Sequence, residues 1–208
     1  PNIPHESVPN GTTEEDNQEI FTEQEMIDAF TIERIGKSGS KFDPDKTRWF
    51  NQQYLRNTPL PELAQALIPL MKEKGWVKEP SYVEGVCKLM IERAVFVADM
   101  LEGHYLFQAP LEYDKDAVAK KWKPGESGAL MIEWKSVLET VEDFSHDGID
   151  AAFKGFLQTK SLGMGAVMPL FRLMLTGTLT GPSSMDVAAL IGKEEVMKRI
   201  DQGVKTLG

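Results

Sequence analysis

The sequence has little of what enzyme active sites and metal centres are built from. Its 208 residues include one cysteine, Cys87, and three scattered histidines, His5, His104 and His146. A lone cysteine excludes an internal disulfide and suits a reducing compartment, and its apolar helical surroundings favour a buried structural thiol over a nucleophile. The histidines lack metal-ligand spacing, so we expect no metal site.

Long apolar runs and strand patterns are also absent. The longest apolar runs, such as VAALI, fall well short of the roughly 20 residues that cross a bilayer, so we expect no contact with a membrane. Neither hairpin signals nor a fixed-period repeat occur. The chain begins at Pro1 without a leader-like segment, and we expect it to be a piece of a longer cytoplasmic protein.

Known catalytic and nucleotide-binding motifs are missing too. The stretch SLGMGAV has Gly163 and Gly165 but no third glycine and no strand before it, and GKSGSK lacks the spacing of a phosphate-binding loop. A nucleophile elbow and paired carboxylates are missing as well. We therefore expect no catalytic residue and no cofactor site in this chain.

What the sequence does contain is a series of helix signals. Thr22 and Glu25 form a capping box, Asp43 and Pro44 predict the start of a helix over KTRWFNQQYL, and Asp114 predicts a cap for DAVAKKW. A second capping box, at Ser81 and Glu84, predicts one long helix from 81 to 101, closed by Gly103. Apolar residues at helical spacing predict further helices around 63–70, 130–141, 149–156, 167–174 and on both sides of Gly192. The expected fold class is all-α.

Charge is distributed unevenly along the chain. The net charge is −9, yet residues 1–33 carry nine acids and no base, and the rest of the chain is balanced. From Arg34 to Arg56 six bases face two acids, a local excess of +4. Such a patch is compatible with binding a phosphate backbone, and a solubilising helix face is the alternative.

Three blocks, in order, resemble bacterial-type glutamyl-tRNA synthetases. The first, FTEQEMIDAFTIERIGKSGSKFDPDKTRWFNQQYLR, is similar to the segment that follows the catalytic domain of that family. LMIERAVFVADMLEGHYLF and FRLMLTGTLTGPSSMDVAALIGKEEVMKRI resemble two later blocks. Two departures are local: Pro169 lies one residue earlier relative to Arg172 than in the family, and Gly181 stands where members often carry Thr or Ser. The first block matches at Phe42, Asp43, Lys46, Trp49, Asn51, Tyr54 and Arg56.

The resemblance implies an organisation and a function. We expect an extended lead-in and stem-contact unit over 1–58, followed by two small helical-bundle subdomains of the class I synthetase anticodon-binding type over 59–116 and 117–208. The family's HIGH and KMSKS signatures, which hold ATP, do not occur here. The resemblance therefore implies the C-terminal part of an enzyme that uses ATP and Mg to attach glutamate to tRNA(Glu), inactive by itself. We expect a monomer that binds tRNA(Glu) and no DNA.

The resemblance also implies which residues contact the tRNA. Trp49, Phe50 and Tyr54 are expected to pack. Phosphates and 2′-hydroxyls of the stem are expected to be contacted by Lys41, Lys46, Arg48 and Asn51.

The anticodon is expected to be bound by the third block and one residue of the second. Arg172 matches the family's anticodon-contacting arginine, and Arg93 matches a position that can contact the third anticodon base. The loop expected to pack on the bases and hydrogen-bond them contains Gly181, Pro182 and Ser184.

Alternatives stay open on the sequence alone. Arg172 could instead form a salt bridge that closes the bundle, and Pro182–Ser183 could be an ordinary helix start. The whole chain could be an all-α protein-interaction module whose acidic N-terminal segment docks a basic partner. A glutaminyl-type or non-discriminating relative that accepts a second tRNA is the third possibility. Binding of tRNA that weakens steeply with salt would favour the anticodon-binding function over the protein-interaction module.

Overall fold

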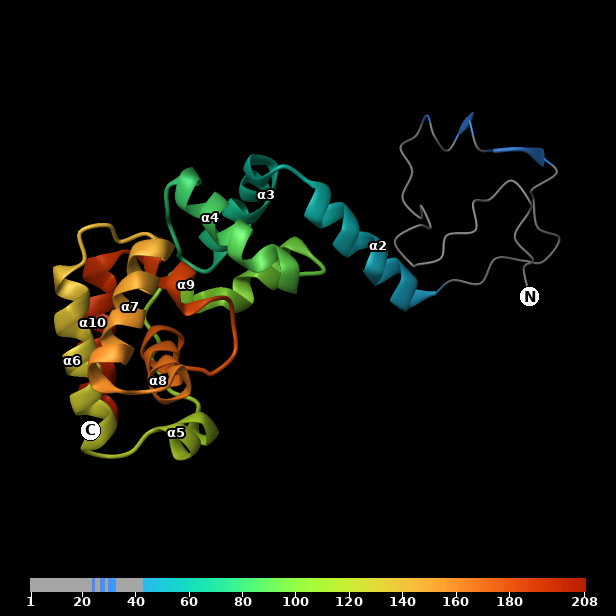
Figure 1. Cartoon of the computed structure of the whole chain (residues 1–208). Helices are drawn as coiled ribbons and strands as arrows, with labels where there is room; N and C mark the ends of the chain where they lie inside the picture. The colour runs from blue at the N-terminus through green and yellow to red at the C-terminus, as the bar shows by residue number, and fades with distance from the viewer. Residues whose placement is uncertain (1–23, 25–26, 29, 33–42) are drawn as a thin grey trace. The chain divides into compact units, whose positions relative to one another are not determined.

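The computed structural model of the chain describes residues 24, 27–28, 30–32 and 43–208 (Figure 1). In this part of the chain every regular element is an α-helix or a 3-10 turn, which confirms the all-α prediction. The capping box at Thr22 and Glu25 and the predicted stem residue Lys41 lie outside the described residues. The chain divides into two units, Pro1–Phe50 and Asn51–Gly208. The boundaries predicted after residues 58 and 116 stay predictions.

The first described helix, α2, runs from Pro44 to Asn57 and begins where the sequence predicts. The Asp43 carboxylate accepts hydrogen bonds from the backbone amides of Asp45, at 3.0 Å, and Lys46, at 3.1 Å. Leu55 is the buried residue of this helix, whereas Trp49 is 41% and Tyr54 54% exposed. Trp49 contacts the ring of Phe50 edge-on, at 5.2 Å between centroids, but neither Trp49 nor Tyr54 is buried among the described residues.

Helices α3, Leu60–Glu73, and α4, Pro80–Met90, pack against each other. Leu63, Leu67 and Met71 of α3 are buried, as are Val83 and Cys87 of α4. The capping box predicted at Ser81 is wrong, because α4 begins at Pro80 after the N-cap residue Glu79, which makes no side-chain cap hydrogen bond. Proline at the first helical position has a suitable φ and needs no cap for its missing N–H.

The single helix predicted from 81 to 101 is also wrong. After α4 come a 3-10 turn, η3 (Ile91–Arg93), an extended residue, Ala94, and a kinked 3-10 segment, η4 (Val97–Leu106). The Asp99 carboxylate accepts hydrogen bonds from the amides of Val95, at 2.9 Å, and Phe96, at 2.8 Å. A short carboxylate that binds nearby amides competes with helical hydrogen bonds, so the apolar spacing continues while the helix does not.

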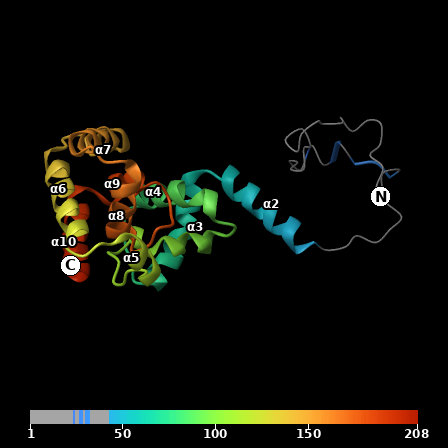
Figure 2. The same cartoon turned by 60° about the horizontal axis from the view of Figure 1, so that its bottom comes forward.

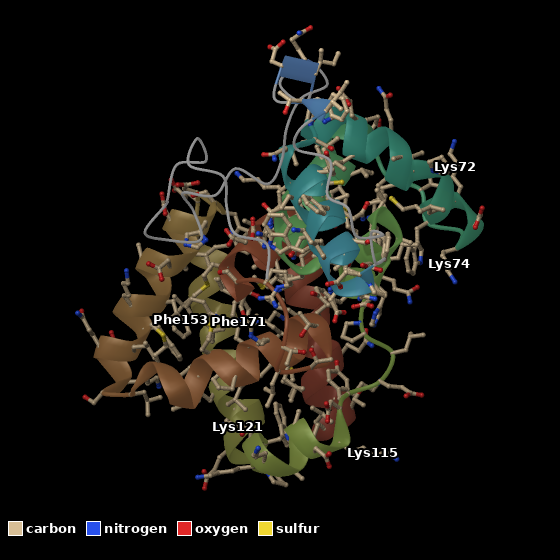
Figure 3. The ribbon with its side chains drawn as sticks, turned by 90° about the vertical axis from the view of Figure 1, so that its right-hand side faces the viewer. Lys72, Lys74, Lys115, Lys121, Phe153 and Phe171 are labelled. Carbon is tan, nitrogen blue, oxygen red and sulfur yellow. The ribbon has the colours of Figure 1, made fainter. Side chains whose placement is uncertain are left out.

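The C-terminal helices form a bundle around one aromatic cluster. Trp134, fully buried, lies 5.2 Å from Phe153, 5.4 Å from Phe156 and 5.7 Å from Phe171 between ring centroids (Figure 3 labels two of them). Asp114 caps α5 as predicted, by accepting from the amides of Asp116 and Ala117. Both views place α5 next to α8 (Figures 1 and 2). The helices are α5 Lys115–Lys121, α6 Glu126–Thr140, α7 His146–Lys160, α8 Met164–Thr176, α9 Ser184–Ile191 and α10 Lys193–Leu207.

None of the described helices is both long enough and apolar enough to cross a bilayer.

Candidate nucleic-acid interface

Two arginines from distant parts of the sequence meet at one loop. Arg93 lies at the end of η3, and its Nη2 donates a hydrogen bond of 2.8 Å to the carbonyl of Gly181. Arg172 lies on α8, and its Nη1 donates to the carbonyl of the next residue, Pro182. The fold therefore brings together four of the five residues that the sequence assigned to anticodon binding, around the loop over 177–183.

This 177–183 loop is tied down at its start. Gly177 ends α8 with a φ of 74°, and its carbonyl accepts a 2.8 Å hydrogen bond from the amide of Asp114. The buried Thr176 hydroxyl donates to the carbonyl of Arg172 at 2.9 Å, and the Thr178 hydroxyl donates to the carbonyl of Thr180 at 2.9 Å. Together with the two arginine contacts, these bonds hold the loop in one conformation before any ligand arrives.

Gly181 is required by the geometry of this loop. Its φ is +134°, a region that residues with a side chain rarely adopt. A Cβ at this position would lie 3.0 Å from the hydroxyl of Tyr105 and 3.6 Å from Nη1 of Arg172. Gly181 therefore replaces the family's Thr or Ser at a point where the backbone passes close to Tyr105 and Arg172.

Tyr105 of η4 is a site residue that sequence reasoning missed. Its side chain is 6% exposed, and its hydroxyl contacts Met90 Sδ at 3.9 Å. Burial raises the pKa of Tyr105, and the charges of Arg93 and Arg172 partly oppose that rise. The phenol therefore keeps its proton at ordinary pH and adds an uncharged polar group beside Gly181 and the two arginines. Helical spacing could not indicate it, because η4 is irregular.

Arg199 of α10 is a second residue that the sequence analysis missed. It is 2% exposed, and its Nη1 donates to the carbonyls of Tyr105 at 2.6 Å and Leu175 at 2.7 Å. Its Nε donates to Glu195 at 2.8 Å. One buried cation thus joins η4, the end of α8 and α10, and positions Tyr105. The sequence around it, MKRI, has the pattern of an ordinary amphipathic helix with a solvated base.

The electrostatics favour an anionic or electron-rich ligand. Burial lowers the pKa of half-buried Arg172; Tyr105 opposes this effect and Arg93 adds to it, but a guanidinium stays charged at physiological pH. Within residues 43–208, neither Arg93 nor Arg172 forms an ion pair with a carboxylate. The described contacts therefore do not support a bundle-closing salt bridge for Arg172. An arginine has five N–H donors, and donors beyond those bound to the loop are available to base edges.

Pro182 and Ser184 are less exposed to solvent than the two arginines. Pro182 is buried, and Ser184 is 1% exposed at the start of α9. Among the described residues, the Ser184 hydroxyl has no hydrogen-bond partner. Its predicted contact with a base stays a prediction, and it would require the hydroxyl to become accessible.

The predicted stem-contact residues on α2 differ in how available they are. Lys46 and Arg48 are exposed, and the Lys46 ammonium lies 5.5 Å from the centroid of the Phe50 ring. The half-buried Asn51 amide donates to the carbonyl of Val95, while Arg56 pairs with Glu92 at 2.7 Å. Asn51 therefore connects α2 to the segment after η3, and a contact of its amide with RNA would compete with that bond.

The described residues contain no group of three or more His, Cys, Asp or Glu side chains that could hold a metal ion.

Comparisons with known proteins show the family of the chain. Residues 62–204 match the family described as the anticodon binding domain. The chain is 40% identical over 192 residues to the glutamate–tRNA ligase of Flavobacterium johnsoniae, covering 92% of this chain and 38% of that protein. The ligase of Amoebophilus asiaticus is 35% identical over 192 residues, covering 92% of this chain and 37% of that protein.

A solved structure shows the same fold. The glutamate tRNA ligase from Elizabethkingia meningosepticum superposes with a TM-score of 0.87 at 35% identity, over 93% of this chain and 38% of that one. The chain thus spans little more than a third of the length of these relatives. It belongs to the anticodon-binding domain family and is homologous to the C-terminal, anticodon-binding region of bacterial glutamate–tRNA ligases.

Proposed function

We propose that this chain binds tRNA(Glu) and distinguishes its anticodon through the surface formed by Arg93, Arg172 and the 177–183 loop. The observation that carries the proposal is the convergence of both arginines on successive carbonyls of that loop. Such contacts fix where the remaining guanidinium donors point. Fixed donors can discriminate between base edges, whereas mobile ones would only supply charge.

Anticodon bases suit such a surface because they are unstacked. In a single-stranded loop the Watson–Crick edges are open to hydrogen bonding, and the base faces can lie on apolar side chains or guanidinium planes. Lys41, Lys46 and Arg48 would contact stem phosphates, which position the tRNA and carry little sequence information.

The proposal extends to a longer protein that contains this chain. That protein would be a cytoplasmic, monomeric glutamate–tRNA ligase that uses ATP and Mg, with its catalytic residues outside the sequence studied. The HIGH and KMSKS signatures are missing from these 208 residues. We therefore expect this chain alone to bind neither ATP nor glutamate in calorimetry, and measurable binding of either would contradict this assignment.

Fluorescence anisotropy with a labelled tRNA(Glu) transcript tests the proposal. We expect affinity that falls steeply between 50 and 200 mM salt, because phosphate contacts release counterions. We also expect weaker binding of a transcript that differs only in its anticodon. Equal binding of both transcripts would contradict anticodon recognition, and no binding of either would favour the protein-interaction module.

A further inference from the structure

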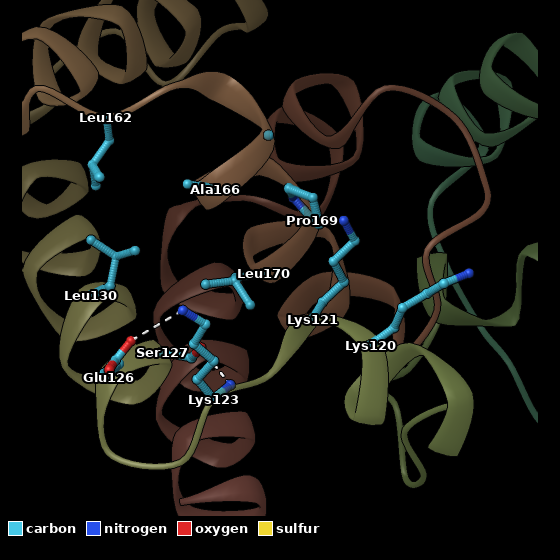
Figure 4. Close-up of a pocket in the computed structure, with 11 residues that line it drawn as sticks. Lys120, Lys121, Lys123, Glu126, Ser127, Leu130, Leu162, Ala166, Pro169 and Leu170 are labelled. Carbon is cyan, nitrogen blue, oxygen red and sulfur yellow. Dashed lines mark hydrogen bonds and ion pairs between the residues drawn. The ribbon is translucent and has the colours of Figure 1, made fainter.

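Two hollows adjoin each other over the first half of α8. One, of about 340 Å³, is lined by Lys120, Lys121 and Lys123 together with residues of α6 and α8 (Figure 4). The other, of about 400 Å³, reaches Arg172. The residues that line both hollows are Lys121, Gly165 and Pro169. The two hollows therefore adjoin along these residues, and together we call them the α5–α8 depression, whose second hollow reaches the proposed anticodon site.

The rim of this α5–α8 depression is basic, although the chain as a whole carries −9. Lys120 and Lys121 are exposed, and no described residue forms an ion pair or hydrogen bond with either side chain. Lys123 lies 3.5 Å from Glu126, but both side chains are 77% exposed, so this pair neutralises little. Among the lining residues Glu126 is the one acid.

The floor near Arg172 is apolar. Met164, 52% exposed, lines the second hollow with Met168 and Leu179. Flexible thioether side chains adapt to flat ligands, and unstacked bases in proteins are often held between apolar or aromatic side chains. Volumes of 340 and 400 Å³ lie within the roughly 300–1,000 Å³ that is typical of small-ligand sites.

We infer that the α5–α8 depression is a second RNA-binding surface, which holds the single-stranded nucleotides that adjoin the anticodon. Lys120 and Lys121 contact their phosphates, and one unstacked base lies over Met164 and Met168 beside Arg172. The inference rests on the proposed function, since it assumes that tRNA occupies the Arg172 site. Phosphates outside the recognised triplet add affinity and orientation without adding specificity.

Gly165 offers a clean way to test the depression. It lines both hollows, and a Cβ built on it has no atom within 4 Å. We expect Gly165→Glu to fold and to place a carboxylate among the lysines. Repulsion between this carboxylate and the RNA phosphates should weaken tRNA(Glu) binding by about tenfold. Gly165→Ala should bind as the wild type does.

A matched control lies on α7. Gly155 also has no atom within 4 Å of a built Cβ, and it lines neither hollow. Gly155→Glu therefore makes the same chemical change elsewhere and should leave binding unchanged. The inference would be overturned if Gly165→Glu and Gly155→Glu weakened binding equally, or if neither variant weakened it.

A lysine pair gives an independent measurement. We expect Lys120→Gln with Lys121→Gln to lower the slope of log affinity against log salt by about 1.4, since each phosphate of a single strand contributes roughly 0.7. The control pair is Lys72→Gln with Lys74→Gln, because Figure 3 shows both lysines well away from Lys121. It should leave the slope unchanged.

Different experimental results would contradict the two proposals. If the α5–α8 depression holds flanking nucleotides, its variants weaken the native and the altered-anticodon transcripts by the same factor. An unchanged salt slope in the lysine variant, with wild-type binding intact, would overturn the depression alone. A wild-type chain that binds no transcript would overturn both proposals.

Discussion

At the residue scale, Arg172 combines a structural contact with a proposed binding role. Its Nη1 holds the carbonyl of Pro182, while its position at the end of the α5–α8 depression leaves it reachable by a ligand. The sequence could predict Arg172, Arg93 and Gly181 as site residues through the family resemblance. It could not predict that they touch, because nothing local in the sequence links η3 to the 177–183 loop.

A side chain at Gly181 should disturb both the stability of the protein and its proposed anticodon surface. Gly181→Ala should destabilise the protein by about 1–3 kcal/mol, because its φ of +134° is strained for alanine and the new Cβ would lie 3.0 Å from the Tyr105 hydroxyl. It should also reduce the preference for the native anticodon, since the carbonyl held by Arg93 must move. Urea unfolding and tRNA anisotropy measure the two effects.

Gly155→Ala is the matched control for that substitution. Gly155 lies within α7, where a Cβ meets open space, so alanine should stabilise the helix by up to about 1 kcal/mol. A Gly181→Ala protein as stable and as selective as the wild type would show that the loop geometry described above is not essential.

Tyr82 should make the stability depend on alkaline pH. Burial raises its pKa from 10.0 to about 12. The unfolded chain therefore loses this proton first, so the contribution of Tyr82 is complete below pH 10 and is lost as the pH rises towards 12. One proton of difference corresponds to a slope of at most about 1.4 kcal/mol per pH unit.

Chemical unfolding between pH 9 and 11 in wild type and Tyr82→Phe measures this contribution. The variant should lose stability less steeply above pH 10, although it also loses the hydrogen bond from the hydroxyl to the carbonyl of Leu106. Parallel curves would show that the phenol titrates normally in the folded protein.

At the scale of elements, the ends of helices decided which predictions held. Asp43 and Asp114 cap their helices as their spacing predicts. Ser81 does not, because Pro80 already starts α4, and after α4 has ended at Met90 the Asp99 carboxylate caps the start of η4. Periodicity reports which face is buried, whereas a new start such as the one at η4 depends on a single capping side chain.

The contact between η4, α8 and α10 depends on the single side chain of Arg199. Arg199→Met keeps an unbranched, flexible side chain but shortens it, removes its charge and leaves the carbonyls of Tyr105 and Leu175 without their donor. We expect a loss of about 3 kcal/mol, at the lower end of the range for breaking a buried charged network, because Glu195 is one-third exposed.

Lys198→Met is the control for this junction, since Lys198 is exposed on the same helix. It should change the free energy of unfolding by no more than about 0.5 kcal/mol. Similar losses in both variants would show that the cost comes from an added methionine on α10 and not from the buried network.

At the scale of the whole molecule, charge is distributed locally along an all-α chain. The acids in residues 1–33 account for the whole net charge, so the remainder can present a basic surface without a net positive charge. The all-α class followed from helix signals that begin at Thr22 and recur to the C-terminal helices. The meeting of Arg93, Tyr105, Arg172 and Arg199 required tertiary packing, which the sequence pattern does not specify.

One measurement tests the central claim most directly: the affinities of the wild-type chain and Arg172→Ala for tRNA(Glu) and for a transcript altered only in its anticodon. We predict that the wild type prefers the native anticodon, and that Arg172→Ala removes the preference at a cost of about 1–3 kcal/mol while still binding both transcripts. If Arg172→Ala keeps the full preference, or the wild type shows none, this surface does not recognise the anticodon.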